Sequence, residues 1–498
     1  MLLDNPKFAL FAVKEIQVKF YGQILSEADQ ERIHEQSLRI LAEVGVRYLG
    51  AKALHILDRQ GVQVDWDSKI ARFSPEMVAE ALALTPRSVL LGARNPAFNF
   101  QLPAQVSRYG MDGTAAFATD FETGERRYGL KKDIENGLRV FQQMDMGVLA
   151  WAPTTASDAP AQVRALHEFF AMIQFCSKHG QHELHRVEQV PYLVEGLAAI
   201  EGGEENVKAR QNYSLIYCPV APLTHDGEML DAYLELGSLE MPVMIMPMPV
   251  NGTTGPASLF SNIALANAEM LSSIVVFQMA HPGRPLIYSS ATGTLDFRGG
   301  GYLAGNPEMG LQSAALTMMG HYYRLPSTSA GCTSDAKQPG PEAVIEKIIT
   351  TLPCLMVGSD IIIGMGEIES DQNLVLEQLV VDNEIAHLCE RLVAGVDTAP
   401  EKDLFADIVQ VGPGGNYLKA RSTRQASRSP EFYMPKLIDR HPYEAWVNLG
   451  RPSIYSAARE KVREILEGPL VDPLPEAVLG KLEDILRRAE REIPETQS

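Results

Sequence analysis

Short apolar segments alternate with longer stretches of helical periodicity through the middle of the chain, from Arg108 onward. Each apolar segment ends in small or polar residues, as the strands of a buried parallel sheet do. Eight such segments occur: RYGMDG from Arg108, GVLAWAP from Gly147, QHELH from Gln181, SLIYCP from Ser214, PVMIMPM from Pro242, LIYSS from Leu286, STSAG from Ser327 and IIIGMG from Ile361. Eight strands separated by helices are the number that closes a (βα)8 barrel.

Helical stretches between these segments supply the crossovers that such a barrel requires. They run from Gln162 to Cys176, Val187 to Ala199, Ser258 to Met279, Pro307 to Tyr323, Pro341 to Leu355 and Leu374 to Val393. A hairpin from Phe117 to Gly129 is inserted after the first strand. An open doubly wound sheet would show the same alternation, but no GxGxxG follows the first strand and no Walker motif occurs. The predicted fold class is α/β, a (βα)8 TIM barrel.

The two ends of the chain depart from this pattern, which predicts three parts. Residues 1–104 combine amphipathic helices with a hairpin and are expected to form an extension packed on the barrel. Residues 105–400 form the barrel, and residues 401–498 add a C-terminal extension. The extension contains a GPGGNYL turn from Gly412 and two helices, from Ala457 to Glu467 and from Glu476 to Glu490.

Composition narrows the classes of partner. The chain has 498 residues, of which 45% are apolar and 21% charged, a balance typical of an ordered globular protein. Its net charge of −19 argues against nucleic acid and anionic membranes, because both bind basic surfaces. The apolar run from Ile348 to Met365 is interrupted by Pro353 and Asp360, so it does not suit a membrane span.

Cysteine usage and the first residues indicate the compartment. Five widely separated cysteines without a CxxC pair fit a reducing environment. The segment MLLDNPKFALF lacks the long apolar core and small-residue cleavage site of a signal peptide. We therefore expect a cytoplasmic protein.

The residues that close the eight strands should meet at one mouth, where barrel enzymes place their chemistry. Trp151, Tyr217 and Tyr288 end three different strands, and ring faces attract cations, so they predict an aromatic box for an onium group. Filling of the barrel interior is an equally good interpretation for each tyrosine alone. Asn251 ends a fourth strand and is a further candidate for substrate binding.

The third strand carries the polar pair Glu183 and His185, which strand alternation places on one face. A charged residue facing the interior of a barrel is costly without a partner, so Glu183 is expected to be functional or paired. His185 either orients Glu183, binds a carboxylate of the substrate, or is exposed without a role. Lys337, on the loop after the seventh strand, competes with it as the partner of that carboxylate.

The stretch STSAGCTSDAK from Ser327 to Lys337 opens a strand into a loop that gathers Cys332, Asp335 and Lys337. With GPGGNYL and the segment PKLIDRHPYEAW from Pro435, it resembles the trimethylamine methyltransferase family over almost the whole chain. The resemblance implies that the chain passes a methyl group to cob(I)alamin carried by a separate corrinoid protein, and that the barrel mouth receives this cofactor.

The resemblance also guides the expected roles. We expect Glu183 and Asp335 to be catalytic, and Gly300, Gly301 and Glu367 to contact the corrinoid. No metal of the chain's own is expected. Two departures from the family pattern concern the substrate: the loop after Lys337 continues with residues 339–341, PGP, instead of an acidic and an amide residue. After GPGGNYL, Ser422 and Thr423 replace the His-Thr of many relatives.

The charge on nitrogen selects the substrate class. A quaternary ammonium leaves as a neutral amine and needs no activation. The resemblance adds a second argument: family members that act on trimethylamine carry pyrrolysine, whereas this chain carries only standard residues. We therefore expect a betaine-type quaternary amine such as glycine betaine, with the corrinoid protein as partner and a homo-oligomeric assembly. A carboxylate against the ammonium would favour the ground state, so rings are the better clamp.

Two other functions stay open. One is a zinc-dependent corrinoid methyltransferase for a thiol or alcohol, with Cys332 and His185 among the ligands, although no spaced His/Cys motif supports it. The other is a non-enzymatic betaine-binding protein on the same scaffold.

Overall fold

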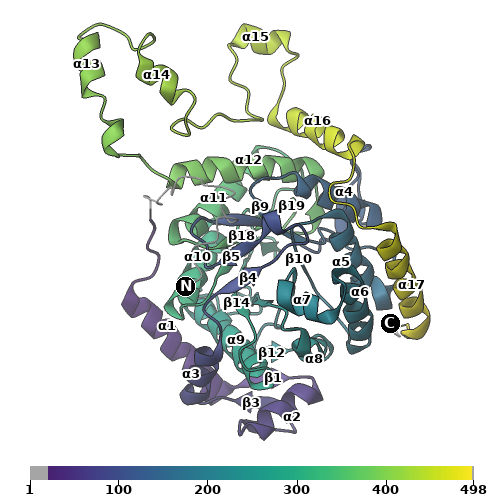
Figure 1. Cartoon of the computed structure of the whole chain (residues 1–498). Coiled ribbons are helices and arrows are strands. Elements are labelled where there is room, and N and C mark those ends of the chain that lie inside the picture. The colour runs from purple at the N-terminus through teal and green to yellow at the C-terminus, as the bar shows by residue number, and fades with distance from the viewer. Residues whose placement is uncertain (1–20, 496–498) are drawn as a thin grey trace.

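Eight parallel strands form the centre of the computed structural model, which describes residues 21–495 (Figure 1). The strands are β6 (Arg108–Met111), β9 (Gly147–Trp151), β10 (His179–His182), β11 (Tyr213–Tyr217), β13 (Val243–Ile245), β14 (Leu286–Tyr288), β17 (Thr328–Ala330) and β18 (Ile361–Met365). Their order in the sheet is β14-β13-β11-β10-β9-β6-β18-β17, and a parallel bridge between Tyr288 and Ser327 joins the two outer strands. The sheet is thus closed, and the predicted (βα)8 barrel is confirmed.

Helices surround this barrel on its outer side (Figure 1). They are α4 (Lys131–Gln142), α5 (Arg164–Phe175), α6 (Val190–Glu201), α8 (Gly227–Glu235), α9 (Leu259–Ala280), α10 (Pro307–Tyr322), α11 (Pro341–Val357) and α12 (Leu376–Val393), with the shorter α7 (Glu204–Arg210) after α6. Helix α9 is, among the described helices, the one long and apolar enough to cross a bilayer, but 89% of its apolar window is buried inside the protein. It is a core helix of the barrel.

Alternation along the strands separates an interior face from a face that meets the helices. On β10, His179 and Gln181 point inward and contact Ser214 of β11, at 2.8 and 3.3 Å between polar atoms. His182 points outward to Glu168 of α5, with its Nε2 3.2 Å from the carboxylate. Desolvation lowers the pKa of His179 to about 4, so its imidazole is neutral inside the barrel. The interior is therefore polar at this level.

The N-terminal extension forms a small layer against α9. It contains α1 (Glu27–Arg39), a π-helical turn (Ile40–Val44), β1 (Val46–Tyr48), α2 (Ala51–Arg59), β2 (Gln63–Asp65), β3 (Ile70–Arg72), α3 (Pro75–Leu84), β4 (Val89–Leu91) and β5 (Phe100–Leu102). Ser26 and Asp29 make a capping box at the start of α1. Strand β1 pairs with β12 (Thr224–His225), which follows the fourth barrel strand, and this pairing joins the extension to the barrel.

Two hairpins project from the strand ends. The predicted insertion forms β7 (Phe117–Thr119) and β8 (Arg126–Tyr128), which share a sheet with β19 (Glu367–Ile368) and β20 (Asn373–Leu374). The second hairpin pairs β15 (Thr294–Leu295) with β16 (Tyr302–Leu303). Both lie at the carboxyl ends of barrel strands, where the candidate site is expected.

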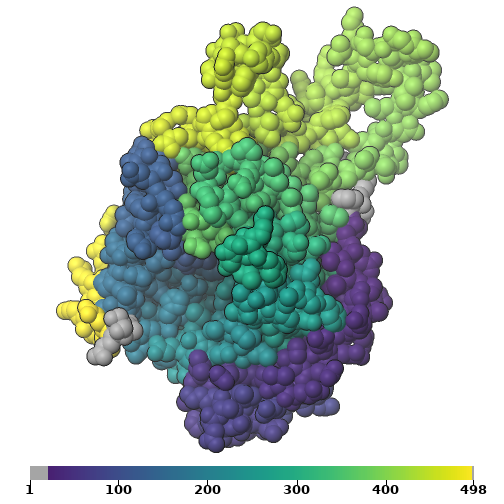
Figure 2. All heavy atoms as spheres, turned by 180° about the vertical axis from the view of Figure 1, so that it is seen from behind, coloured from purple at the N-terminus to yellow at the C-terminus, as the bar shows by residue number. Residues whose placement is uncertain are grey.

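The C-terminal extension returns to the barrel by two helices that match the predicted ones. Helix α16 (Ile454–Glu467) packs on α12, where Arg459 pairs with Glu377 at 2.6 Å. Helix α17 (Glu476–Glu492) packs on α6. Between α12 and α16 the short helices α13 (Phe405–Val411), α14 (Arg421–Ala426) and α15 (Tyr443–Asn448) stand away from the barrel (Figures 1 and 2). We propose that the described residues divide into the three parts expected from the sequence, which are the N-terminal extension, the barrel and the C-terminal extension.

A buried ion pair connects the last two strands to two helices. The Lys347 ammonium of α11 lies 2.9 Å from the Asp382 carboxylate of α12, and both side chains are fully buried. The same ammonium donates to the carbonyl of Cys332, after β17, at 2.6 Å and to that of Gly364, in β18, at 2.9 Å. Asp382 also accepts from the Gly366 amide and the Gln378 side chain. The pair therefore holds the ends of β17 and β18 in place.

Removal of one partner should destabilise the fold strongly. We expect Lys347→Ala to lower the free energy of unfolding by about 3–5 kcal/mol, because Asp382 would be left buried and unpaired. Urea unfolding followed by circular dichroism measures this. Lys461→Ala removes an exposed lysine paired with Glu464 and should cost less than about 1 kcal/mol. A Lys347→Met/Asp382→Leu double variant should recover most of the loss; equal losses for the single and double variants would contradict the assignment.

Candidate functional site

Three carboxyl groups meet at the carboxyl ends of the first and eighth barrel strands. Asp112 follows β6, Glu367 begins β19 directly after β18, and Asp371 lies in the turn between β19 and β20. Asp112 and Asp371 share a hydrogen bond. Glu367 is fully buried, and the other two are partly buried. We name Asp112, Glu367 and Asp371 the carboxyl cluster.

Burial shifts the titration of the whole cluster. Desolvation raises the pKa of Asp112, and it raises the pKa of Glu367 and of Asp371 well above their usual range. The negative charge of Asp112 raises the pKa of the other two further. Lys347 opposes these shifts, but its ammonium is bonded to Asp382. The environment thus favours the protonated, uncharged form of the cluster.

Several buried polar atoms around the cluster lack a hydrogen-bond partner. They are both carboxyl oxygens of Glu367, Oδ1 of Asp371, Nε1 of Trp151 and Nε2 of Gln181. Glu367 approaches the Ala115 amide, but neither oxygen makes a hydrogen bond of good geometry. A buried polar atom without a partner costs free energy, and native proteins leave few of them except where a ligand completes the bonding. The strand ends therefore have the character of a ligand site.

Trp151 belongs to this site by register. It pairs with Gln181 across β9 and β10, so both side chains lie on the interior face of the barrel. The ring is 97% buried, since its exposed fraction is 3%, and it lies against Gly113, where a Cβ would come within 2.7 Å of the indole. Trp151 therefore keeps its predicted place at the barrel mouth.

Glu183 lies near the carboxyl cluster. Its Oε1 accepts from the Thr114 hydroxyl at 3.2 Å, and Thr114 is two residues after Asp112. Burial raises the pKa of the Cys218 thiol, and the charges of Glu183 and Asp112 add to this rise, which places all three groups in one region. Strand β10 ends at His182, so Glu183 and His185 lie in the following loop. His185 is half-exposed, with Nε2 3.8 Å from the Glu183 carboxylate.

The aromatic box predicted from three rings does not form. The Tyr217 hydroxyl is 2.7 Å from Nδ1 of His225, and its ring packs edge-on against Phe277 of α9. The Tyr288 hydroxyl donates to Asn267 of α9 at 2.8 Å. Both rings therefore face the helical layer, and their predicted role in substrate binding is wrong. A shift of one residue in strand alternation decides between interior and helical layer.

The side chains of Asp335 and Asn251 are hydrogen-bonded to neighbouring loops. The Asp335 carboxylate accepts from the amides of Ala304 and Gly305 at 2.7 and 2.9 Å and from the Ser370 hydroxyl at 2.8 Å. Asn251 is buried and bonded to the Pro256 carbonyl and to Asn262. These bonds give both residues a part in positioning loops, and the catalytic role of Asp335 and the substrate contact of Asn251 stay predictions.

Lys337 and the glycines lie on exposed loops. Lys337 donates to the Asp335 carbonyl at 2.7 Å. Gly300 and Gly301 form the tip of the β15–β16 hairpin, and a Cβ on either would meet no atom within 4 Å. The predicted contact of both glycines with the corrinoid stays a prediction. The Glu367 side chain is fully buried, and its predicted contact with the corrinoid also stays a prediction.

The ligands suggested for zinc lie in different surroundings. His225 is bonded to Tyr217 and to the Ser272 hydroxyl at 2.7 and 2.9 Å, and burial lowers its pKa to about 3. Cys332 is buried beside Lys347, and desolvation raises the pKa of its thiol. Among residues 21–495, no group of three or more His, Cys, Asp and Glu side chains is arranged to hold a metal ion.

Two residues of the site were not predicted as site residues. Asp371 follows Glu367 and Glu369 in GEIESDQ, and three acids within five residues after a barrel strand were an available signal. Tyr302 comes from β16; burial raises the pKa of its phenol well above the usual range, and Asp371 and Asp112 add to the rise. Only the folding of the hairpin over the strand ends brings Tyr302 to the cluster.

The amino-acid sequence matches known proteins over nearly its whole length. The family model described as trimethylamine methyltransferase (MTTB) matches residues 10–494. Trimethylamine methyltransferase MttB of Methanosarcina thermophila is 30% identical over 472 residues, covering 92% of this chain and 96% of the relative. A glycine betaine methyltransferase of Desulfitobacterium hafniense (strain Y51) is 27% identical over 474 residues, covering 95% and 98%.

A solved structure was also found, the monomethylamine methyltransferase MtmB of Methanosarcina barkeri, with a TM-score of 0.49 and 10% identity over 92% of this chain and 91% of that one. The barrel topology stands on the strand order alone. The match of the family model extends over nearly the whole chain, from the N-terminal extension to α17. The chain therefore belongs to the trimethylamine methyltransferase (MTTB) family of methyltransferases.

Proposed function

We propose that the protein removes a methyl group from a quaternary amine and transfers it to a corrinoid carried by a partner protein. The observation that carries this proposal is the carboxyl cluster beside Trp151, with buried oxygens that lack partners at the barrel mouth. At this mouth the face of the Trp151 ring is the group that attracts a cation. The corrinoid, when bound, supplies the nucleophile that accepts the methyl group.

Trp151 is the proposed clamp for the ammonium group. Its ring face attracts a cation without forming a charge pair that would have to be broken as the nitrogen loses its charge. The raised pKa of each cluster carboxyl serves the same end, because an uncharged acid does not stabilise the bound ammonium at the expense of the transition state. The site then works mainly by holding the carbon–nitrogen bond in line with the acceptor.

The carboxyl cluster has a second proposed role after the bond breaks. The departing amine is neutral and has a lone pair, with which it can attack the transferred methyl group in the reverse reaction. A proton passed from the Asp112–Asp371 pair to this nitrogen removes the lone pair and leaves one carboxylate beside a new ammonium ion. The protonated acid of the hydrogen-bonded pair supplies the proton, and after the product leaves, the remaining carboxylate takes a proton from solvent.

The substrate is proposed to be of the betaine type, as in the glycine betaine methyltransferase relative. His185, at the edge of the site beside Glu183, is the proposed partner of the substrate carboxylate, because Lys337 is bonded to its own loop. The β15–β16 hairpin tip is the proposed contact for the corrinoid protein. We also propose a cytoplasmic location, for which the five free cysteines are the support.

The first test concerns Trp151. Trp151→Ala should weaken binding of glycine betaine by about 1–2 kcal/mol, the range for a cation over a ring in a shielded site, whereas Trp151→Phe should retain most of the affinity. Isothermal titration measures both variants. Unchanged affinity in a folded Trp151→Ala protein would remove this ring from the site.

Methyl transfer to reduced free cobalamin, followed by absorbance, separates the three candidate functions. Turnover of glycine betaine without added zinc supports the proposal. Turnover of trimethylamine, or inactivation by a chelator, would contradict it. Binding of the amine without any methyl transfer would instead favour a non-enzymatic betaine-binding protein.

A second prediction follows from the raised pKa values of the cluster. Because the protonated form traps the product, the net rate of demethylation in the presence of added dimethylglycine should fall as pH rises through the raised pKa. Asp112→Asn should lose this pH dependence and show stronger product inhibition at low pH. Rates measured between pH 5 and 9 check this, with Asp120→Asn, a partly buried acid of the inserted hairpin that pairs with Arg127, as control. The same pH profile in the Asp112 variant would exclude proton transfer from this pair.

A third prediction assigns the substrate carboxylate. His185→Ala should reduce kcat/KM for glycine betaine roughly tenfold or more and leave choline, which has no carboxylate, nearly unchanged. Lys337→Ala is the matched variant and should affect both amines little. If His185→Ala harms both substrates equally, the residue acts on the fold or on docking of the corrinoid protein. If Lys337→Ala shows the selective loss, the carboxylate partner is Lys337.

A further inference from the structure

The part of the C-terminal extension between residues 403 and 452, here called the arm, lies outside the barrel (Figures 1 and 2). Its helices α13, α14 and α15 have six or seven residues each and contain no buried residue. Isolated helices of this length are unstable in water, since most helical stability comes from packing of an apolar face. The three helices of the arm therefore lack, in this single chain, the packing that would stabilise them.

Helix α13 presents an apolar face to solvent. Phe405, Ile408 and Val409 are exposed by 67%, 55% and 66%. Their spacing of three and four residues places them on one side of the helix. Contiguous apolar patches of this kind on a folded protein mark an interaction surface. An apolar helix face with this spacing fits a groove between other elements.

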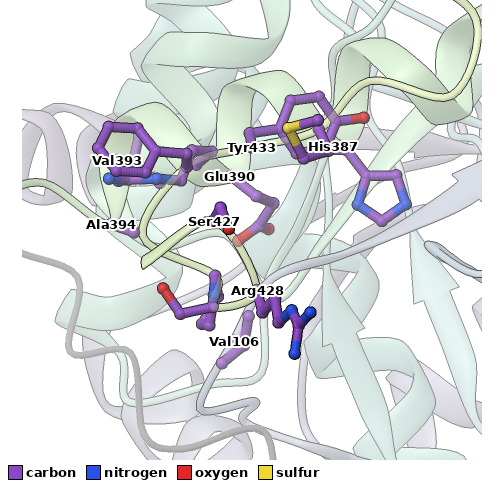
Figure 3. A pocket seen from close by; sticks show the side chains of 13 residues that line it. Val106, His387, Glu390, Val393, Ala394, Ser427, Arg428 and Tyr433 are labelled. Carbon is purple, nitrogen blue, oxygen red and sulfur yellow. The ribbon is translucent and has the colours of Figure 1, made fainter. Parts of the chain in front are cut away.

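A cavity of about 500 Å³ with the complementary character lies at the base of the arm (Figure 3). Val393 and Ala394 at the end of α12, together with Phe432 and Met434 of the arm, supply much of its apolar wall. None of the residues of α13 lines it. The cavity and the helix face therefore belong to the same chain but do not meet in it.

Two arginines and one glutamate, Glu390, line the cavity, whereas two aspartates lie beside the apolar face of α13. Arg391 and Arg428 line the cavity, and the Arg391 guanidinium donates to the backbone carbonyls of Gly395 and Glu431. Helix α13 carries Asp407, and Asp403 lies just before it. Acidic groups on the helix would meet basic groups at the rim, which favours this pairing over one of like charges.

We propose that α13 of one copy of this chain occupies the α12 cavity of a second copy, and that the second copy returns the contact. A two-fold axis makes such an exchange reciprocal, because each subunit offers the same helix and the same cavity. The arm has about fifty residues, enough for the 20–30 residues per side of a stable interface. The occupant is thus another copy of this chain.

Light scattering of the full chain tests the assembly. The wild type should have a mass of at least twice 54.7 kDa at micromolar concentration. A Phe405→Ser/Ile408→Ser/Val409→Ser variant should shift at least tenfold in concentration toward the monomer while its circular dichroism stays unchanged. A control triple, Val44→Ser/Leu84→Ser/Ile345→Ser, changes three other exposed apolar residues elsewhere and should not shift the oligomeric state.

Cysteine pairing tests the geometry directly. Chains with the single substitution Ile408→Cys are mixed with chains with the single substitution Ala394→Cys under mild oxidation. A covalent heterodimer on a non-reducing gel is the expected result, and neither chain alone should form it. A wild type that is monomeric at all concentrations, an α13 triple variant that keeps the oligomer, or a mixture without the heterodimer would each overturn the proposal.

Discussion

The buried Lys347–Asp382 pair is the interaction on which the candidate site depends. One ammonium group ties the carbonyl after β17, a carbonyl within β18 and a carboxylate of α12 to a single point. The Gly364 carbonyl is available because the backbone there has φ of 138°, and a Cβ would come within 2.0 Å of the Gly331 carbonyl. The irregularity of β18 at this glycine directs the following residues toward β6. The pair thus places Glu367 beside Asp112.

The same pair sets the electrostatics of the site. The positive charge of Lys347 opposes the rise in the pKa of the carboxyl cluster, but its ammonium already pairs with the Asp382 carboxylate at 2.9 Å. Burial raises the pKa of each carboxyl group, and the groups therefore keep their protons. A group of this kind stabilises the fold fully below its unfolded pKa, and that contribution is lost as pH rises through the folded pKa. The site accordingly holds polar groups that destabilise the fold at neutral pH, a cost that fits a functional role.

The barrel was predictable because strand ends and crossover helices are local patterns. Six of the eight apolar segments contain the whole strand that the structure has, and the other two overlap strands that begin earlier, at His179 and Tyr213. The inserted hairpin and the last two helices are also present. The sequence carried less information on whether a given strand residue faces the barrel interior or the helical layer. In SLIYCP the alternation was visible, but nothing local to the segment distinguishes the interior from the helical layer; Ser214 was inside and Tyr217 outside because His179 and α9 lie where they do. For Trp151 the same reasoning succeeded, because its neighbour Gln181 also faces inward.

The sequence by itself determined the closed barrel, the place of the mouth and the gathering of Trp151 and Glu183 there, since each follows from which residues end a strand. Tertiary structure alone decided that Asp335 clamps a loop, that Glu367 is sealed from the surface, and that Asp371 and Tyr302 join Asp112. These outcomes depend on how the hairpins fold over the mouth and on which backbone amides lie within hydrogen-bonding distance of a carboxylate. Such contacts join segments distant along the chain, so no local pattern of residues encodes them.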